Sequence, residues 1–335
     1  MSSSWYIDEA DFHEIESHEG RMKFLLRYAV LAPSTHNTQP WSFRITPDGI
    51  EVFADFSRRL MTLDPGDREL MLSVGAAVTN FRVAAAHFGY DTMVLYRSAP
   101  AETGPVALVT VRMTCLPDAS LQRLFPAIRR RRTSRKAFKP EPIDPDAMQK
   151  LCELVDASSG MLRLILPRDR RTIADFVEQA DRQQMRRAAV RAEIADWIRT
   201  RRARDGIPAA GILPRVIAPL GPWLLRNLDI SRWRARRDRE VVESAGALLL
   251  VCAEDDRVPL LQAGELLERV LLTVTQSGLQ YGFLNQAIEV EELREKVRTL
   301  SGSTFPPQLI VAIGIGAPQP KRTPRRNVEA VLAKG

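Results

Sequence analysis

Residues 68–89 read RELMLSVGAAVTNFRVAAAHFG, and residues 260–278 read LLQAGELLERVLLTVTQSG. Both stretches carry apolar residues at helical spacing, and both end at a glycine, Gly89 or Gly278, which commonly terminates a helix. Each stretch also has a glycine 14 positions before that end, and this spacing returns to nearly the same helix face after about four turns. The two helices therefore predict an internal duplication, although a terminal glycine is also common in unrelated buried helices.

Strand patterns accompany both helices. Residues 41–45 and 50–55 alternate around a Pro-Asp-Gly turn, which predicts a β-hairpin. Residues 245–253 and 307–314 are apolar without alternation, which is typical of buried strands. The pattern is that of a duplicated α+β unit. Further predicted elements are helices at 21–31 and 144–155 and strands at 93–96, 106–111 and 162–166.

One segment of the second half has an unusual composition. Residues 182–239 are dense in arginine and contain three tryptophans and four prolines, and residues 184–204 predict a basic amphipathic helix. A long insertion in a compact protein is usually functional, for example as a lid, but a solvated surface excursion explains this composition equally well. We therefore expect a first half at 1–118 and a second half at 119–335 that carries this insertion.

The overall composition excludes several classes of protein. The chain has 335 residues, 45% of them hydrophobic and 27% charged, which is typical of a globular protein and not of a disordered or fibrous one. It has no apolar run long enough for a membrane span, and the N-terminus lacks the basic and apolar regions of a secretory signal. Three widely spaced cysteines fit a reducing compartment, so we expect a cytoplasmic protein. The four histidines show no metal-binding spacing.

Positive charge points to an anionic partner. The net charge is +7, and only seven of the 48 basic residues are lysine. Arginine offers a planar fork that suits phosphate and carboxylate groups. A nucleic acid could use the same charge, but the chain lacks a helix-turn-helix, zinc-finger or RNP pattern. The sequence therefore favours a small phosphate ligand over nucleic acid.

The first candidate motif is PSTHNTQPW at residues 33–41, directly after a predicted helix. Prolines fix the backbone on both sides, and the short polar side chains present hydroxyl and amide groups suited to the edge of a planar heteroaromatic ligand. A plain capped turn has the same composition. His36 within the motif is either a proton source or an ordinary exposed loop residue.

Two further motifs are basic. Residues 131–138 read RRTSRKAF, where guanidinium groups beside hydroxyls would form a phosphate cradle, a solvated basic face or a nucleic-acid patch. Residues 320–326 read PKRTPRR and follow the last predicted strand. This third motif is a basic tail by itself, and beside the second motif it could complete a phosphate site.

Together, the motifs resemble those of the nitroreductase superfamily of FMN-dependent oxidoreductases. Residues 32–41 match the family pattern A-P-S-x-x-N-x-Q-P-W at every fixed position, and residues 132–138 match R-x-S-x-[KR]-x-F. Segments 64–70, 130–135 and 322–326 further resemble the actinobacterial Acg-like branch. The resemblance spans nearly the whole chain and is weakest across the insertion.

The order of the motifs differs from that of ordinary family members. Those proteins carry the arginine motif first and form an intertwined homodimer, in which the arginine motif of one subunit and the polar loop of the other hold each flavin. Here the polar loop is in the first half and the arginine motif in the second, while residues 156–160 have lost the loop pattern. The resemblance therefore implies an internally duplicated, nitroreductase-like α+β fold. Antiparallel central sheets would be flanked by helices, and the fused pseudo-dimer would keep one flavin site.

The resemblance also implies which residues hold FMN. The arginine motif would contact the phosphate, the ribityl chain and the pyrimidine side, with Lys136 near the N1–C2 carbonyl. The polar loop would border the isoalloxazine, Lys321 or Arg322 would hold the phosphate, and Asn285 would lie near N5. The implied cofactor-binding residues are Pro33, Ser34, Thr35, Asn37, Gln39, Arg132, Thr133, Ser134, Lys136, Asn285, Lys321 and Arg322.

The implied activity is an FMN-dependent oxidoreductase reaction. NAD(P)H would reduce the flavin, and a nitroaromatic, a quinone or a related acceptor would reoxidise it by ping-pong kinetics, without a catalytic side chain. A rival is a non-catalytic flavin-sequestering protein whose insertion covers the site. The expected partners are NAD(P)H and a small electron acceptor, without nucleic acid or membrane. The chain would act as a monomeric pseudo-dimer or a weak homodimer.

Overall fold

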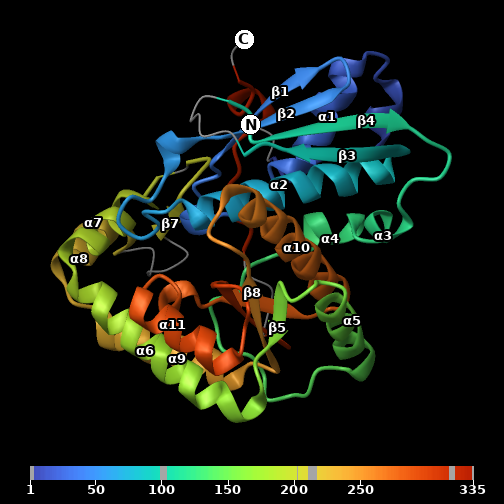
Figure 1. The fold of residues 1–335 in the computed structure, drawn as a ribbon. Coiled ribbons are helices and arrows are strands. Elements are labelled where there is room, and N and C mark those ends of the chain that lie inside the picture. The colour runs from blue at the N-terminus through green and yellow to red at the C-terminus, as the bar shows by residue number, and fades with distance from the viewer. Residues whose placement is uncertain (1–3, 99–103, 202, 210–216, 317–320, 334–335) are drawn as a thin grey trace.

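The computed structural model describes residues 4–98, 104–201, 203–209, 217–316 and 321–333 (Figure 1). Its helices are α1 (His18–Ala29), α2 (Arg68–His87), α3 (Ala119–Gln122), α4 (Phe125–Arg130), α5 (Pro145–Asp156), α6 (Arg170–Arg186), α7 (Ala188–Asp196), α8 (Gly221–Asn227), α9 (Ser231–Ser244), α10 (Arg257–Gln276) and α11 (Glu291–Ser301). Its strands are β1 (Trp41–Thr46), β2 (Gly49–Ala54), β3 (Tyr90–Tyr96), β4 (Ala107–Met113), β5 (Leu162–Leu164), β6 (Ile198–Arg199), β7 (Ile207–Pro208), β8 (Ala247–Cys252), β9 (Gln280–Phe283) and β10 (Pro307–Gly314).

Two four-stranded antiparallel sheets form the framework. The first has the order β1-β2-β4-β3, and the second has the order β5-β8-β10-β9. The helix α2 precedes β3 in the first sheet, as α10 precedes β9 in the second. The predicted α+β class with a duplicated antiparallel sheet is therefore confirmed. The strand β9 was not predicted, because its four residues, QYGF, lack a clear alternating pattern.

The two long helices cross between the sheets, with α2 and α10 adjacent in Figure 1. At the crossing, a Cβ atom on Gly75 would lie 2.1 Å from the carbonyl oxygen of Leu261. Reciprocally, a Cβ on Gly264 would lie 2.2 Å from the carbonyl oxygen of Leu72. The glycines that revealed the repeat in the sequence therefore let the two backbones touch at the pseudo-twofold axis.

The helices also connect the two hydrophobic cores. Leu260, Leu261 and Leu272 of α10 pack in the core beneath the first sheet. Leu72 of α2 packs in the core of the second sheet. Each central helix thus buries apolar surface in both halves, which makes the halves interdependent.

Segments from the second half complete the first. Residues 121–128 supply buried side chains to the first core. Near the C-terminus, the amide of Phe43 in β1 donates to the carbonyl of Val331 at 2.8 Å, and the amide of Ala333 donates back to Phe43 at 2.8 Å. We propose that the halves at 1–118 and 119–335 exchange these segments, as the subunits of an intertwined dimer would.

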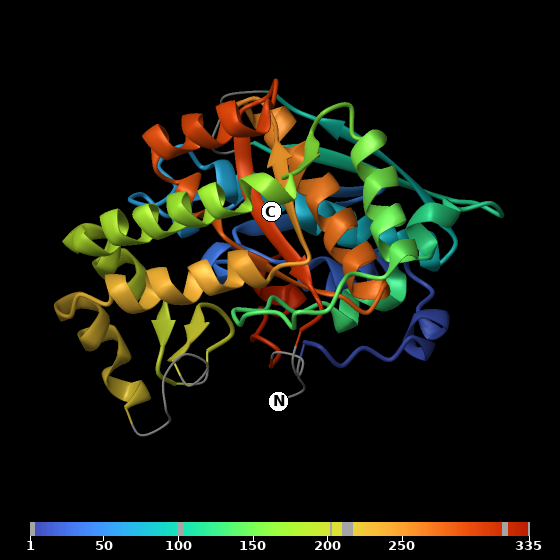
Figure 2. The same ribbon diagram turned by 90° about the horizontal axis from the view of Figure 1, so that it is seen from below.

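The insertion differs from its sequence prediction. The helix predicted over 184–204 is wrong, because α6 ends at Arg186 and Arg187 has extended backbone torsions of φ −76° and ψ 114°. This break lets Met185 and the following α7 reach one apolar cluster with Leu60 and Leu63. The helices α6 and α9 run side by side, as Figure 2 shows. Among the described residues, every helix is too short or too polar to cross a bilayer.

The helix crossing makes a testable prediction. Gly75→Ala places a methyl group against the backbone of α10, so the helices must separate, and we expect a loss of ~1–3 kcal/mol in the free energy of unfolding. Gly66→Ala is the control, since its nearest foreign atom would be the Cγ of Arg68 at 3.7 Å. Urea denaturation measures both variants. A Gly75→Ala protein as stable as the control would contradict the close crossing.

Candidate functional site

A buried arginine joins the second motif to the first. Arg131 is 2% exposed, and its Nη2 donates to the carbonyl of Leu31 at 2.7 Å, directly before the polar loop. Its Nη1 donates to the hydroxyl of Tyr281 in β9 at 2.5 Å. Its Nε lies 3.3 Å from Glu268 Oε1 on α10. The motifs that the sequence separates by about a hundred residues therefore meet inside the protein.

Glu268 extends this network to α2. It is fully buried, and in the orientation that satisfies both groups the Asn80 amide donates to it at 2.9 Å and accepts from the amide of Ala32 at 3.1 Å. Burial raises the pKa of Glu268 to about 7, against the opposite influence of Arg131 and Arg325. A buried pair gains little net stability because both ions lose water, so its main effect is to fix position.

Three guanidinium groups gather on one tryptophan. The guanidinium carbons of Arg132, Arg322 and Arg325 lie 4.6, 5.4 and 5.2 Å from the ring centre of Trp5. Within the described part of the chain, no carboxylate lies at ion-pair distance from any of the three arginines. Burial and neighbouring arginines lower the pKa of Arg132 to about 10 and that of Arg325 to about 9. This arginine cluster is therefore concentrated positive charge that favours an anion.

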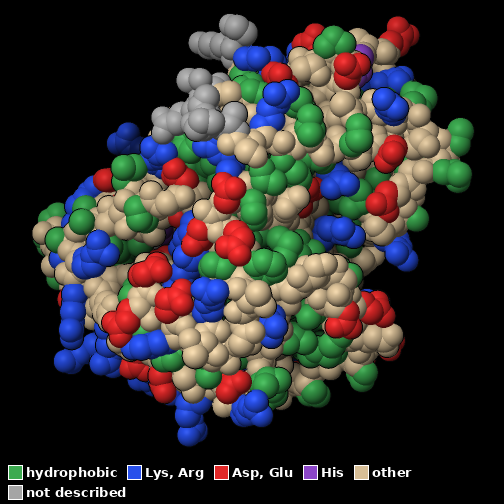
Figure 3. Space-filling model, viewed as in Figure 1, with side chains coloured by type: hydrophobic (Ala, Val, Ile, Leu, Met, Phe, Trp, Pro, Cys, Tyr) green, Lys and Arg blue, Asp and Glu red, His purple; other side chains and the backbone are tan. Residues whose placement is uncertain are grey.

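Arginines of the insertion, unlike those of the cluster, form ion pairs with acidic side chains. In Figure 3, basic side chains crowd the lower left of the molecule, where Figure 1 places α6, but acidic side chains are interspersed among them. Arg182 pairs with Glu178 at 2.5 Å, and Arg239 pairs with Glu243 at 2.9 Å. Because these charges are compensated, the arginine cluster around Trp5 is the better anion site.

The third motif reaches the polar loop through Arg325. Its Nη1 donates to Asn37 Oδ1 at 2.8 Å. Asn37 Nδ2 donates in return to the carbonyl of Pro324 at 3.1 Å, and Gln39 Oε1 accepts from the amide of Arg326 at 2.8 Å. All three motifs thus share one region. Pro320, the first residue of the third motif, lies outside the described residues.

The polar loop holds unusual backbone conformations. His36, Asn37 and Gln39 have φ angles of 51°, 56° and 53°, in the left-handed region that favours glycine. Such conformations cost of order 1–3 kcal/mol each in the extreme cases and persist where surrounding contacts determine them. Here Ser34 Oγ accepts from the amide of Gln39 at 2.9 Å. Backbone strain of this kind clusters at functional sites. It therefore favours the interpretation of residues 33–41 as a ligand-binding loop over that of a plain capped turn.

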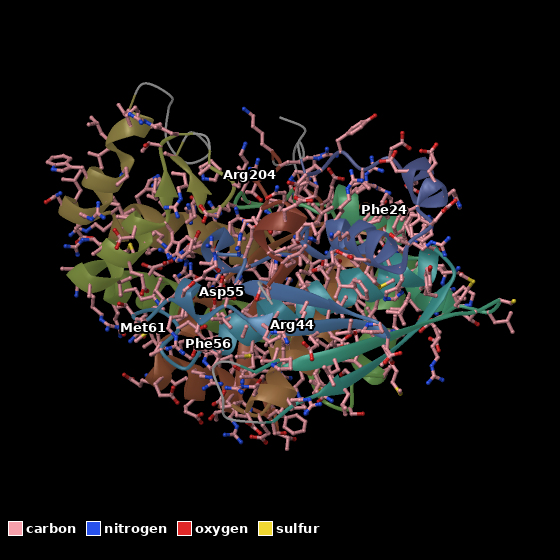
Figure 4. All side chains as sticks on the ribbon, turned by 90° about the horizontal axis from the view of Figure 1, so that it is seen from above. Phe24, Arg44, Asp55, Phe56, Met61 and Arg204 are labelled. Atoms are coloured by element: carbon pink, nitrogen blue, oxygen red, sulfur yellow. The ribbon has the colours of Figure 1, made fainter. Side chains whose placement is uncertain are left out.

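The insertion is fastened to the same loop. Gln39 Nε2 donates to the carbonyl of Arg204 at 2.9 Å, and the amide of Gly206 donates to the carbonyl of Asn37 at 3.1 Å. Between them, Asp205 pairs with Arg58. Arg204 is labelled in Figure 4. We call residues 204–206 the strap. A freely solvated surface excursion would lack these contacts.

A second contact holds the insertion against the first half. The carboxylate of Glu193 on α7 accepts from the amides of Thr62 and Leu63 at 2.8 and 2.9 Å. Within the insertion, Arg199 pairs with Asp205 at 2.9 Å. The insertion therefore docks on the segment after β2 as well as on the polar loop.

The remaining predicted residues differ in how far they are buried and hydrogen-bonded. Thr133 forms a β-bridge with Tyr281, and the amide of Ser134 donates to the carbonyl of Tyr281 at 2.7 Å. Lys136 is exposed, and its amide donates to Ser134 Oγ at 3.3 Å. Pro33 is buried at the start of the polar loop, whereas Lys321 is exposed beside the arginine cluster in sequence.

Thr35 and Asn285 meet on a residue that the sequence did not single out. Thr35 Oγ1 donates to one carboxylate oxygen of Glu69, and Asn285 Nδ2 donates to the other at 3.1 Å. Glu69 lies in the first turn of α2 and is 2% exposed. Asn285, which the resemblance places near N5, is therefore linked to the polar loop through a carboxylate that both share.

The imidazole of His36 is uncharged near neutral pH. Its Nδ1 is buried and has no partner among the described residues. Burial, Arg234 and Arg135 lower the pKa of His36 to about 3. An imidazole with this pKa carries no spare proton at pH 7, so the proton-source hypothesis for His36 is disfavoured.

Sequence reasoning missed several residues of the site, namely Trp5, Glu69, Glu268 and Arg325. Arg325 belongs to a motif that was recognised, so its charge was visible, but its contact with Asn37 was not. Glu69 lies in segment 64–70, which resembles the Acg-like branch, but no role followed from that resemblance. Trp5 and Glu268 gave no signal, because single aromatic or acidic residues have no pattern. In the described ranges, no cluster of His, Cys, Asp and Glu could hold a metal ion. A surface hollow of about 540 Å³ beside His18 and Thr46 is lined by none of the predicted residues.

The Arg131 network makes a second prediction. Arg131→Met leaves Glu268 buried without a counter-ion, so we expect a loss of ~3–5 kcal/mol in the free energy of unfolding at pH 8. The loss shrinks at pH 5, because a protonated Glu268 needs no counter-ion. The double variant with Glu268→Met restores part of the stability. Arg129→Ala, an exposed control paired with Glu9 at 3.5 Å, changes it by about 0.5 kcal/mol. Equal losses in the single and double variants would contradict this network.

Comparison with known proteins gives the family. No protein-family model matches the chain. Two solved nitroreductase structures resemble it only distantly. One is NfnB from Mycobacterium smegmatis in complex with NADPH, at 16% identity and a TM-score of 0.43 over 64% of this chain and 98% of that chain. The other is a structure named as a nitroreductase from Anabaena variabilis, at 11% identity and a TM-score of 0.46 over 93% and 92%.

Sequence relatives are more informative. Two Mycobacterium tuberculosis proteins have names that place them among the NAD(P)H nitroreductases. The one named acg is 28% identical over 316 residues, which cover 93% of this chain and 95% of that protein. The other is 30% identical over 322 residues, which cover 93% of this chain and 90% of that protein. The motifs identified from the sequence and this similarity over nearly the full length agree, and the chain belongs to the nitroreductase family.

Proposed function

We propose that the chain is an FMN-dependent NAD(P)H oxidoreductase that reduces a nitroaromatic compound, a quinone or a related small acceptor by a ping-pong mechanism. In this proposal it acts as a cytoplasmic monomer, a pseudo-dimer with one site. One observation carries the proposal: three arginine side chains gather on Trp5, and one of them, Arg325, is hydrogen-bonded to Asn37 of the polar loop.

The residues present fit FMN. The arginine cluster suits a phosphate, which guanidinium groups bind with charged hydrogen bonds. Buried polar atoms without partners within the described part of the chain include Asn285 Oδ1, His36 Nδ1 and Arg325 Nε. Buried polar atoms of this kind cost free energy unless something bonds them, and a flavin carries donors and acceptors along its edge.

The family resemblance assigns roles to these residues. Arg132, with Lys321 or Arg322, would hold the phosphate, and Ser134 and Lys136 would lie toward the pyrimidine side. To these we add Arg325, which lies over the same tryptophan as Arg132 and Arg322. The polar loop would border the isoalloxazine from the first half. When bound, FMN supplies the two-electron chemistry between a nicotinamide and the acceptor. A cation near the pyrimidine would favour the negative charge that develops there, because fixed charges act strongly in a site without bulk water.

A second candidate function is flavin sequestration without turnover. The strap favours it, since the carbonyl of Arg204 accepts from Gln39 and the amide of Gly206 donates to Asn37, which holds the insertion on the polar loop. An insertion that stays closed would keep a nicotinamide and an acceptor out. An insertion that opens would leave the oxidoreductase reaction intact.

Two measurements test the proposal. The purified chain should be yellow, or become yellow when FMN is added, with a flavin absorbance spectrum. The FMN-loaded protein should then oxidise NADPH or NADH in the presence of a quinone or a nitroarene, with parallel-line steady-state kinetics. A chain that binds no FMN would refute both candidate functions. A yellow protein without turnover on any acceptor would leave sequestration.

The arginine cluster gives a prediction for binding. Single substitutions Arg132→Ala, Arg322→Ala and Arg325→Ala should each weaken FMN binding by roughly 10- to 100-fold, because each removes a charged hydrogen bond worth ~1.5–3 kcal/mol. The control is Arg236→Ala, an exposed residue of α9 that pairs with Glu240 at 3.2 Å. Fluorescence titration with FMN measures all four variants. If the cluster variants bind FMN as tightly as the control, the phosphate assignment is wrong.

The strap gives a prediction that separates the two functions. Asp205→Asn weakens the contact to Arg58, which keeps the strap on the first half, and the contact to Arg199 within the insertion. If the insertion sequesters the flavin, the wild-type protein shows no NAD(P)H oxidation and Asp205→Asn restores it. If the chain is an oxidoreductase, as we expect, both proteins turn over. Arg44→Ala, which loses an exposed pair with Glu51 at 3.0 Å, controls for loss of a surface ion pair.

A further inference from the structure

The ring of Trp5 is the contact that all members of the arginine cluster share. The three guanidinium carbons lie between 4.6 and 5.4 Å from its centre, within the range in which a cation is attracted to an aromatic face. The tryptophan is 3% exposed, so the attraction acts with little competition from water. The proposed function assigns a phosphate to the arginines but gives Trp5 no role.

Hydrogen bonds of the N-terminal segment hold this ring in place. The indole Nε1 of Trp5 donates to the carbonyl of Thr323 at 2.8 Å, and Ser4 Oγ donates to the carbonyl of Arg325 at 3.1 Å. Two residues after the tryptophan, Ile7 is 2% exposed in the core beneath the first sheet. The ring is therefore fixed both to the first half and to the segment that carries two of the arginines.

The arginines reach the ring from two distant segments. Arg132 precedes α5, and its Nη1 donates to the carbonyls of Arg129 and Arg131 at 3.0 and 2.5 Å. Arg322 and Arg325 follow β10. Among the described residues, the guanidinium group of Arg322 forms no hydrogen bond or ion pair, so its contact with the ring is the interaction that holds it in the cluster.

Electrostatic repulsion opposes this arrangement. Three positive charges that share one ring repel one another. The electron-rich face of an indole attracts each cation and offsets part of the repulsion. A polar group of the cluster still lacks a partner, because the buried Nε of Arg325 has no hydrogen bond among the described residues. An aliphatic side chain in place of Trp5 would fill the space without attracting the cations.

We propose that Trp5 is a positioning residue for the phosphate end of the site, and that its ring assembles the arginine cluster before a ligand arrives. The ligand class that suits this cluster is a phosphate monoester, whose charge of about −2 and three terminal oxygens can accept from several guanidinium groups at once. The inference rests on the proposed function, since the monoester in question is that of FMN. Trp5 therefore determines how strongly the site prefers FMN to riboflavin, which has the same ring system without the phosphate.

Paired titrations of the flavin-free chain with FMN and with riboflavin separate this role from a general effect on stability. Trp5→Leu should weaken FMN binding roughly 10-fold or more and riboflavin binding less than about 2-fold, because only the phosphate contacts lose their support. Trp5→Phe keeps an aromatic face without the indole donor and should restore most of the FMN affinity. Near-ultraviolet circular dichroism verifies that each variant is folded.

Phe81→Leu is the matched control for these titrations. Phe81 is fully buried in the same core as Trp5, and among the described residues no guanidinium group lies over its ring. The control should lose packing as Trp5→Leu does, but keep the wild-type ratio of FMN to riboflavin affinity. Equal losses for both flavins in Trp5→Leu, or a Trp5→Phe variant no better than Trp5→Leu, would overturn the positioning role.

A second test needs no flavin. Inorganic phosphate added to the flavin-free chain should change the fluorescence of Trp5 to a saturating value, because the anion alters the charge around the ring. Subtracting the titration of Trp5→Phe isolates this residue among the five tryptophans, and sodium chloride at equal ionic strength controls for screening. Arg322→Ala should raise the midpoint roughly 10-fold. A signal that persists in Trp5→Phe, or the absence of a saturable signal, would overturn the proposal.

The failure of this inference can be told apart from the failure of the proposed function. A chain that never acquires a flavin spectrum would refute the proposed function, while the phosphate titration would still decide whether Trp5 assembles an anion site. A chain that binds FMN and turns over, but whose preference for FMN over riboflavin is unchanged in Trp5→Leu, would refute the role of Trp5 alone.

Discussion

The arrangement of this protein depends on how Arg131 is buried. A guanidinium group without water must find partners for its charge and its donors, and here they come from Glu268, Tyr281 and the carbonyl of Leu31. The first two partners belong to the second half, and the third belongs to the first half at the entrance of the polar loop. Removing the arginine from this position would leave both the charge of Glu268 and the loop entrance unsupported. Arg131 is therefore one buried polar contact that fixes the first half against the second.

The repeated framework contrasts with segments of the candidate site that do not repeat. The sheets and the helices α2 and α10 repeat almost element by element, and the glycine crossing preserves their symmetry. The site segments do not repeat. After α1 the chain forms the polar loop, whereas after α5 it makes only a short turn with Ser159 and Gly160 in left-handed conformations. Before α1 the N-terminal segment contributes Trp5, whereas the segment before α5 contributes Arg132. The other two arginines of the cluster, Arg322 and Arg325, come from the segment after β10. One half thus supplies the aromatic floor and the loop, and the other supplies the charge.

Much of the framework was predictable from local patterns. The bounds of α2, the hairpin of β1 and β2, and the strand β10 follow from apolar periodicity, because each element buries one face or all of its surface. The break at Arg187 was not predictable, since its cause is a tertiary contact: Met185 and Val190 must both reach the cluster with Leu60.

The candidate site was predictable only in part. The motifs with several polar residues in fixed order could be recognised, and the structure brings them together around Arg131 and Arg325. Glu69 could not be recognised, because an acidic residue in the first turn of a helix is normally an exposed residue that favours the helix dipole. Only the fold shows that this carboxyl group is buried beside Asn285 and Thr35.

The most direct measurement of the central claim is the FMN stoichiometry of the monomeric chain, determined from flavin absorbance and protein concentration after gel filtration. Two segments of a single polypeptide that form one site predict one FMN per chain of 37.7 kDa. One FMN per two chains would mean that the site forms between molecules, and two FMN per chain would mean that both halves keep a site. Either result, or none bound, would contradict the account.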